Sequence, residues 1–307
     1  MWPNCCPSNN ISIAGSTEVY YAYWIYRTWN HGFADGQCLV KGGVEVLGWD
    51  INPQSMRAFE TYGKSLQTLA AECDVFVTML PEETHVAMVQ RQLLDAGIPE
   101  ASLFIDCSTI DVESTKELAD NLASMGHGFV DAPVSGGSEA AVKGALSFMV
   151  GGSNINIERA KPLLMVMGER QTEFGAAGSG QAAKACHNMI CGITALAVCE
   201  GFALADALGL DLERFFQLCS NAAAQSWVLQ NRCPVPGPAP DAPSSNTYAP
   251  GFAARLMAKD LKLAQQAAKD CGQSTDFGAE AARRFAEFAA GASAELDFSA
   301  IYRSIRK

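Results

Sequence analysis

Positive charge is scarce in this 307-residue chain, in which 22 lysines and arginines face 33 aspartates and glutamates for a net charge of −11. No basic stripe offsets this deficit, so nucleic acid and an anionic membrane surface are excluded as expected partners. A small anionic ligand must therefore meet positive charge that is placed locally. A lysine set among glycines and apolar residues becomes a candidate for binding or catalysis.

A secretory signal is missing, and so is the arginine-rich, amphipathic leader of a transit peptide. The eleven cysteines are an odd number and, apart from Cys5 and Cys6, occur singly. This pattern favours free thiols in a reducing compartment. It predicts a cytoplasmic protein, with the mitochondrial matrix as the eukaryotic alternative. Cys186, His187 and Cys191 suggest a metal, but no second ligand pair is near, so packed thiols are favoured and no metal is expected.

The longest apolar run covers residues 185–208 and is interrupted by His187, Asn188, Glu200 and Asp206. Its length is sufficient for a membrane span. Its polar interruptions fit a helix buried between two domains better. We therefore expect no membrane segment.

Short apolar runs alternate with helical stretches between residues 44 and 167. The expected strands are 44–49, 74–80, 103–106, 128–132 and 146–150, and the expected helices are 53–62, 65–72, one opened by Pro81, 112–125 and 154–167. This alternation predicts an α/β fold with a Rossmann-like, doubly wound parallel sheet covered on both faces. Ligands of such sheets bind at the carboxyl ends of the strands.

Beyond about residue 175 the periodicity is almost wholly helical, apart from a proline-, serine- and asparagine-rich loop over 233–250. We therefore expect a dinucleotide-binding domain over 35–174. An all-helical substrate and dimerisation domain should follow over 175–307, led by a long interdomain helix.

The glycine-rich turn that normally opens a dinucleotide-binding sheet is absent. Only Gly32 falls on a fingerprint position, and Arg27 and Trp29 occupy the first two. Either the cofactor turn has been remodelled, or residues 1–34 are an atypical leader that results from misannotation. The second interpretation is favoured because an aromatic strand over 19–26 would be crowded at the centre of a parallel sheet.

Asp50 ends the first expected strand and follows Gly32 by 18 residues. An acidic side chain at this position accepts hydrogen bonds from the adenosine ribose, which favours NAD over NADP. A simple helix-capping aspartate is the alternative.

The segment 131–137 ends in Ser135, Gly136 and Gly137. Glycines allow main-chain N–H groups to converge on an anion, and the serine adds a hydroxyl donor. The segment therefore predicts a cradle for the carboxylate of a small acid. A plain turn between a strand and a loop is the alternative.

Lys184 and Asn188 lie four residues apart, on one face of the expected interdomain helix. Burial would lower the pKa of Lys184 and prepare its amine for proton transfer. The alternatives are a lysine whose stem packs while its amine reaches solvent, and an asparagine that only packs between helices. We expect a small hydroxy acid as substrate, with Lys184 moving the hydroxyl proton and Asn188 orienting it.

These segments, in this order, resemble the 3-hydroxyisobutyrate dehydrogenases of the β-hydroxyacid dehydrogenase family. The resemblance runs from about residue 36 to 307. It is strongest at 131–152, 178–188 and 257–261, and the motifs at 225–227, 233–237, 251–252 and 297–299 resemble the 3-hydroxyisobutyrate branch in particular.

The resemblance implies NAD-linked oxidation of 3-hydroxyisobutyrate to methylmalonate semialdehyde, a step of valine breakdown, by a homodimer or homotetramer. It assigns catalysis to Lys184 and Asn188, carboxylate binding to Ser135, Gly136 and Gly137, and cofactor contacts to Leu80, Pro81, Thr109 and Lys259. The expected cofactor contacts also include Gly32 and Asp50, from their spacing, and His85, at a position where the chain departs from the family. His85 stands where the family often has asparagine. The alternative for Lys259 is a solvated surface lysine paired with a carboxylate. Two other functions remain open: reduction of tartronate or succinate semialdehyde, and acid binding without a cofactor because the glycines are missing.

Overall fold

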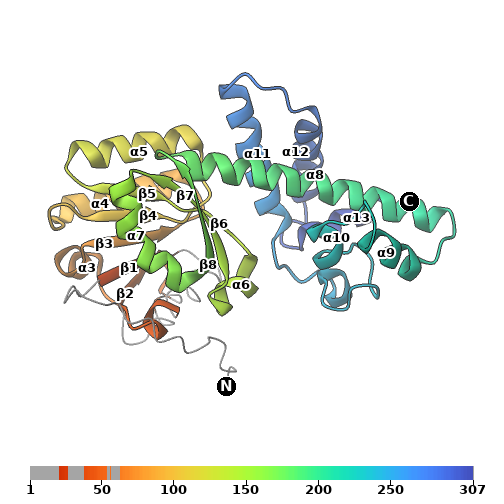
Figure 1. Cartoon of the computed structure of the whole chain (residues 1–307), viewed down its shortest axis with the longest axis horizontal. Helices are drawn as coiled ribbons and strands as arrows, with labels where there is room; N and C mark the ends of the chain where they lie inside the picture. Colours follow the sequence, from red (N-terminus) through yellow and green to blue (C-terminus); the bar gives the residue numbers. More distant parts are fainter. Residues whose placement is uncertain (1–20, 27–37, 54–55, 57–62, 307) are drawn as a thin grey trace. The chain divides into compact units, whose positions relative to one another are not determined.

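The computed structural model describes residues 21–26, 38–53, 56 and 63–306. The chain divides into two compact units, 1–184 and 185–307. The first unit is a sheet covered by helices, and the second is almost wholly helical (Figure 1). The two units meet within the long helix α8, Ser179–Ala207. The boundary expected from the sequence, after residue 174, lies ten residues earlier.

The strands of the first unit form one sheet in the order β2-β1-β3-β4-β5-β7-β6, with β8 paired to β7. Their bounds are Tyr21–Tyr26 (β1), Glu45–Asp50 (β2), Val75–Met79 (β3), Leu103–Asp106 (β4), Gly128–Asp131 (β5), Val134–Ser135 (β6), Leu146–Gly152 (β7) and Gly168–Gly175 (β8). The pairs from β2 to β5 are parallel, as expected. Strand β7 runs antiparallel to β5 and β6, so the sheet is mixed at this edge.

Strand β1 lies between β2 and β3 and pairs in parallel with both. Within the expected leader 1–34, Tyr21–Tyr26 is the part that the structure describes, and it forms the strand that the sequence interpretation disfavoured. In this register Trp24 is paired with Gly48 of β2 and with Val77 of β3. Gly32 and most of the helix expected over 53–62 lie outside the described residues.

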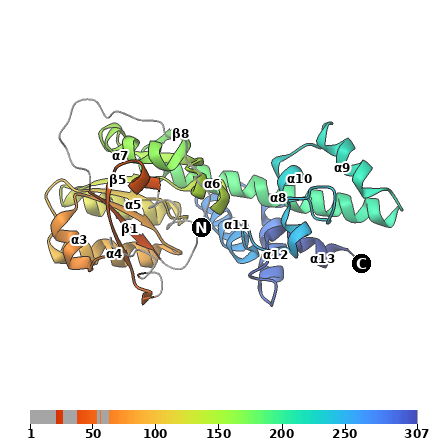
Figure 2. The ribbon, with the colours of Figure 1, turned by 90° about the horizontal axis from the view of Figure 1, so that it is seen from below.

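Helices cover both faces of the sheet (Figure 2). They are α3 (Leu66–Glu72), α4 (Glu83–Ala96), α5 (Val112–Ser124), the short α6 (Gly137–Lys143) and α7 (Asn154–Met167). Three of them begin at side chains that accept a main-chain N–H of the first turn: Ser65 for α3, Asp111 for α5 and Ser153 for α7. Such caps satisfy N–H groups that have no partner inside the helix.

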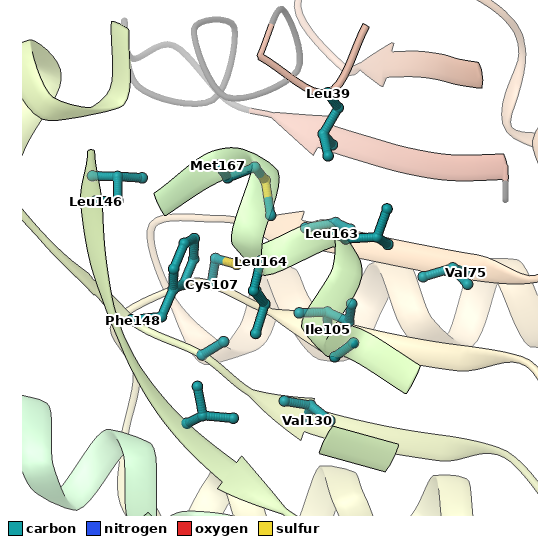
Figure 3. Close-up of a cluster of buried hydrophobic side chains, with 14 of the residues drawn as sticks. Leu39, Val75, Ile105, Cys107, Val130, Leu146, Phe148, Leu163, Leu164 and Met167 are labelled. Carbon is teal, nitrogen blue, oxygen red and sulfur yellow. The ribbon is translucent and has the colours of Figure 1, made fainter. Parts of the chain in front are cut away.

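Each face of the sheet carries its own apolar cluster. Leu163 and Leu164 of α7 pack with Ile105 of β4 on one face (Figure 3). Helices α3, α4 and α5 pack against Phe76 and Phe104 on the other. Because successive side chains of a strand point to opposite faces, Phe104 and Ile105 serve different clusters. Burial on both faces explains why the strands are almost continuously apolar.

The second unit contains the remainder of α8 and the helices α9 (Leu212–Ser220), α10 (Trp227–Asn231), α11 (Ala254–Asp270), α12 (Asp276–Ala289) and α13 (Tyr302–Ile305), with two 3-10 turns, η1 (Pro243–Asn246) and η2 (Phe298–Ile301). Its core contains Phe202 of α8, Met257 and Leu261 of α11, and Phe285 of α12. Helix α8 is long and apolar enough to cross a membrane, and the core helix of a soluble protein meets the same criteria.

The loop expected over 233–250 is ordered by two of its own side chains. The Ser244 hydroxyl donates to the carbonyls of Cys233 and Val235, at 2.7 and 3.0 Å. The Tyr248 hydroxyl donates to the carbonyl of Pro234. These bonds satisfy main-chain groups that no helix or sheet pairs in this loop.

Asp297 is a buried carboxylate that joins distant segments of the second unit. It accepts the main-chain N–H groups of Gly251 and Phe252, at 3.1 and 3.0 Å, and that of Ser299. The Nε of Arg232 lies 3.5 Å from the same carboxylate. A buried charge with this many partners is stable only when all of the segments are in place.

Candidate active site

Lys184 contacts the segment that was predicted to receive a carboxylate. Its side chain is buried, with a relative exposure of 7%, and its Nζ donates to the main-chain carbonyl of Val134 at 2.7 Å. Val134 directly precedes Ser135, so the amine lies beside the serine and glycine pair. The first unit thus brings together the two elements that the sequence assigned to one site.

The backbone after Ser135 has a conformation that requires glycine. Gly136 has a φ of 136° and Gly137 a φ of 71°, values that side chains disfavour. A Cβ on Gly136 would lie 2.5 Å from the Cβ of Ala140. Ser135 is half-buried and ends strand β6, which fixes its main chain against β7.

Asp131, at the end of β5, fixes the first turn of α8. One carboxylate oxygen accepts the N–H of Gly178 at 2.8 Å, and the other accepts the N–H of Gln181 at 2.9 Å. Burial raises the pKa of Asp131, and these N–H groups act in the opposite direction. A Cβ on Gly180 would lie 2.3 Å from the carbonyl oxygen of Met149. The close approach of the glycine-rich turn therefore sets the position of the helix that carries Lys184.

The predicted cofactor contacts Leu80 and Thr109 lie on adjacent loops, after β3 and β4. The N–H of Leu80 donates to the hydroxyl of Ser108 at 2.8 Å, which joins the two loops. Leu80 is buried, whereas Pro81 and Thr109 are half-buried. His85 is also half-buried and lies in the first turn of α4. These residues follow the carboxyl ends of parallel strands, where ligands of such sheets bind.

Asp106 is a buried carboxyl beneath these loops that sequence reasoning missed. Its Oδ1 accepts the hydroxyls of Thr78 and Ser108, at 2.7 and 2.5 Å, and the N–H of Ser108 at 3.2 Å. Its Oδ2 has no hydrogen-bond partner among the described residues. Burial raises the pKa of Asp106 to about 6, and the charge of Asp131 acts in the same direction. The sequence signal was slight, because this aspartate simply ends an apolar strand.

In the second unit, Asn188 is held by a second acidic side chain. Its Nδ2 donates to Asp260, and its Oδ1 lies 2.8 Å from Nδ1 of His187. The Nζ of Lys259 lies 3.7 Å from the other oxygen of Asp260. Lys259 therefore has the carboxylate partner that was weighed as its alternative role. Asp260 was not predicted as a site residue, although it directly follows Lys259.

Asp50 ends β2 and is buried, with one carboxylate oxygen accepting the N–H of Asn52 at 2.6 Å. A carboxylate at the end of this strand fits the ribose hydroxyls of a dinucleotide. The same hydrogen bond stabilises the turn that follows, so the capping role and the ribose role are compatible. The predicted cofactor contact Gly32 lies outside the described residues.

The described residues contain no group of three or more histidine, cysteine, aspartate or glutamate side chains that could hold a metal ion. Among the described cysteines, Cys73, Cys186, Cys199, Cys219, Cys233 and Cys271 are free thiols. Burial raises the pKa of Cys73 to about 12 and that of Cys233 to about 11. These two thiols are therefore unreactive core side chains.

Two family models together match most of the chain. Residues 34–178 match the NAD binding domain of 6-phosphogluconate dehydrogenase. Residues 178–305 match a model described as NAD-binding of NADP-dependent 3-hydroxyisobutyrate dehydrogenase. The first match contains the predicted carboxylate-binding residues Ser135, Gly136 and Gly137. The second contains Lys184, Asn188 and Lys259.

Named relatives agree with these models. A probable 3-hydroxyisobutyrate dehydrogenase of Mycobacterium tuberculosis is 40% identical over 272 residues, which cover 87% of this chain and 92% of the relative. The human mitochondrial 3-hydroxyisobutyrate dehydrogenase is 35% identical over 91% of this chain and 84% of its own length. A solved structure of the Mycobacterium tuberculosis 3-hydroxyisobutyrate dehydrogenase with L-serine has a TM-score of 0.88 at 38% identity and covers 94% of this chain and 100% of that chain.

Identities of this size extend over both units, and the solved relative shares their folds. The resemblance drawn from the glycine-rich segments is confirmed. The chain is an NAD(P)-linked hydroxyacid dehydrogenase and belongs to the 3-hydroxyisobutyrate dehydrogenase family.

Proposed function

We propose that this enzyme oxidises 3-hydroxyisobutyrate to methylmalonate semialdehyde, a step of valine breakdown, with Lys184 as the group that moves the hydroxyl proton. The observation that carries the proposal is the buried Lys184 amine at 2.7 Å from the carbonyl of Val134, next to the serine and glycine pair. An amine beside an anion-receiving loop suits a short hydroxy acid, because its neutral form can accept the hydroxyl proton. In a chain with a net charge of −11, the ammonium that then forms supplies local positive charge near the acid.

In the proposed reaction, the substrate carboxylate is bound by Ser135, Gly136 and Gly137, and the hydroxyl lies at the Lys184 amine. The amine accepts the hydroxyl proton during oxidation and returns it to the carbonyl oxygen in the reverse direction. When bound, NAD supplies the acceptor for the hydride that leaves the carbon atom. The hydrogen bond to Val134 holds the amine in place before the substrate arrives.

We further propose that Asn188 orients the substrate hydroxyl or the Lys184 amine. The two residues are one helical turn apart on α8. The bond from Asn188 to Asp260 fixes the asparagine amide, so that its orientation does not depend on the substrate. The assignment of Lys259 to cofactor or substrate binding is also a proposal; it rests on the family resemblance, because the contact with Asp260 fits the alternative role equally well.

We propose NAD rather than NADP as the preferred cofactor, because Asp50 ends β2. Its carboxylate would accept bonds from ribose hydroxyls and repel a 2′-phosphate. Leu80, Pro81, His85 and Thr109 would contact the rest of the dinucleotide. The ratio of kcat/KM for NAD and NADP tests this: we expect at least tenfold preference for NAD in the wild type and a smaller ratio in Asp50→Ala. A wild type that prefers NADP contradicts the assignment.

The test of the mechanism is Lys184→Ala. General acid–base groups contribute about 10²- to 10⁴-fold, so kcat should fall by at least about a hundredfold while NADH still binds, as followed by nicotinamide fluorescence. The control is Lys161→Ala, which removes an exposed lysine paired with Glu158 in the same unit. This control should keep wild-type turnover. Unchanged turnover in Lys184→Ala would remove the mechanism.

Substrate choice is tested by steady-state rates on a short panel. It contains 3-hydroxyisobutyrate, L-serine, glycerate and 4-hydroxybutyrate, with L-serine included because the solved relative is described with it. We expect the highest kcat/KM for 3-hydroxyisobutyrate. A higher value for 4-hydroxybutyrate or glycerate would favour the reductase of a neighbouring semialdehyde acid.

We also propose that the enzyme self-associates through its second unit. Leu204 of α8 and Leu208, which directly follows that helix, are each more than half exposed, and Leu210 and Leu218 nearby in the sequence are at least half exposed. Large apolar side chains left exposed in one part of the chain favour an interface there. Light scattering should give a dimer or tetramer, and Leu208→Asp should dissociate it while Met125→Asp in the first unit does not.

The cytoplasmic location remains a prediction, for which cell fractionation is the test.

A further inference from the structure

Gln181 is a buried polar side chain in the first turn of α8 that the mechanism above does not use. Its relative exposure is 1%. The side-chain Nε2 donates to the carbonyl of Ser108 at 2.8 Å, and the side-chain Oε1 accepts the N–H of Ile110 at 3.2 Å. Its main-chain N–H donates to Asp131 at 2.9 Å. Both ends of the amide are therefore used on one loop.

The loop that Gln181 holds is the one that carries Thr109. Ser108 and Ile110 are the residues on either side of Thr109, so a single amide fixes the main chain before and after it. The hydroxyl of Ser108 also accepts the N–H of Leu80. Both proposed cofactor loops are thus joined to the start of α8 through Ser108 and Gln181.

Lys184 lies three residues after Gln181, on the next turn of the same helix. Its amine contacts Val134, which follows Asp131 in the carboxylate-binding segment. Gln181 therefore touches the cofactor loop with its side chain and the substrate segment with its main chain. Bonds of this kind in a water-excluded site fix relative positions, because losing one leaves a buried group without a partner.

We propose that Gln181 is a positioning residue that sets the Lys184 amine at the correct distance from the cofactor loop at Thr109. The inference rests on the proposed function, because it takes Thr109 as a cofactor contact and Lys184 as the proton-moving group. Gln181 itself touches neither ligand. Its effect is on alignment, and small misplacements of reacting groups reduce rates steeply.

Gln90 of α4 provides a matched control for the substitution. It is also a buried glutamine of the first unit, with a relative exposure of 2%. Its side-chain nitrogen and oxygen have no hydrogen-bond partner among the described residues. Gln90→Met and Gln181→Met thus make the same chemical change, and only the second removes hydrogen bonds.

The experiment compares Gln181→Met, Gln90→Met and the wild type in single-turnover NADH formation, in KM for 3-hydroxyisobutyrate and in NADH dissociation constant. For Gln181→Met we expect a single-turnover rate at least about tenfold lower, NADH binding weakened by roughly threefold or more, and KM changed less than the rate. Gln90→Met should match the wild type in all three. Gln181→Glu keeps the size of the side chain and the acceptor for the Ile110 N–H, but it sets a carboxyl oxygen against the Ser108 carbonyl, so its losses in rate and NADH affinity should be at least as large. It is the second variant if the methionine variant does not fold.

The inference is overturned if folded Gln181→Met or Gln181→Glu shows wild-type rate and NADH affinity, or if Gln90→Met loses as much rate. A lower melting temperature with unchanged rate also overturns it, because that outcome shows a purely structural role. A wild type that neither binds NADH nor oxidises the acid is a different failure. It rejects the proposed function, and the inference with it.

Discussion

Asp106→Asn should make the first unit more stable at neutral pH than the wild type. The buried carboxyl has one oxygen with three hydrogen-bond donors and a second oxygen without a partner among the described residues. The amide oxygen of asparagine can accept the same donors from Thr78 and Ser108. The substitution then removes a charge that burial disfavours, at the cost of one buried amide group that still needs a partner.

The magnitude follows from the raised pKa, which is about 6 in the folded protein against an ordinary value of 3.8. Between these values the folded state binds more protons than the unfolded state, so the free energy of unfolding falls as pH rises. The difference of about two pKa units corresponds to roughly 3 kcal/mol lost by the wild type once pH is above 6. Between pH 4.5 and 8.0 the stability of Asp106→Asn relative to the wild type should rise by about 2 kcal/mol.

Urea unfolding of both proteins at pH 4.5 and pH 8.0, followed by circular dichroism, measures this change. At each pH, the free energy of unfolding of the wild type is subtracted from that of the variant. Contributions from all other titrating groups are the same in both proteins and cancel. The quantity to compare is the midpoint at constant slope. A difference that is the same at both pH values, or that shrinks at pH 8.0, refutes the reasoning, because it means that Asp106 is ionised at little cost in the folded state.

Three further substitutions test the packing described above. Gly180→Ala should lower stability by roughly 1 to 3 kcal/mol in thermal unfolding, because its Cβ meets the Met149 carbonyl at 2.3 Å. Gly201→Ala in the same helix has no atom within 4 Å of its Cβ and should raise stability by about 0.5 to 1 kcal/mol, so equal effects would contradict the packing of the first turn. Asp297→Asn should cost about 3 kcal/mol because it leaves Arg232 without its buried partner, and a loss below 1 kcal/mol in urea unfolding would show that the pair is dispensable.

Most of the first unit could be predicted from periodicity, and its exceptions have physical reasons. The strand expected at 103–106 and the helix expected at 154–167 have the bounds found in the structure. The reversed direction of β7 was not predicted, because a buried strand has the same apolar composition whether its neighbours run parallel or antiparallel. The aromatic strand β1 was disfavoured on crowding, a property that depends on which residues of β2 and β3 lie beside it.

The sequence supports a site prediction where residue type alone limits the chemistry. A lysine in an apolar helix and a pair of glycines after a serine indicated proton transfer and anion binding, and the structure joins the lysine to Val134, the residue before that serine. Gln181 and Asp106 were not predicted, because their roles depend on hydrogen bonds to residues far away in the sequence. The bond from Gln181 to Ser108 spans 73 residues, and that from Thr78 to Asp106 spans 28. A single sequence does not reveal such pairs.

The position of Asp297 has a consequence for biosynthesis. The N–H groups of Gly251 and Phe252 find their acceptor only in a residue that the ribosome adds more than forty positions later. The β1 to β7 layer is complete much earlier and can fold while translation continues. The helices that surround Asp297 must wait, so a nascent chain halted before that codon would carry an incomplete second unit attached to a finished nucleotide-binding layer.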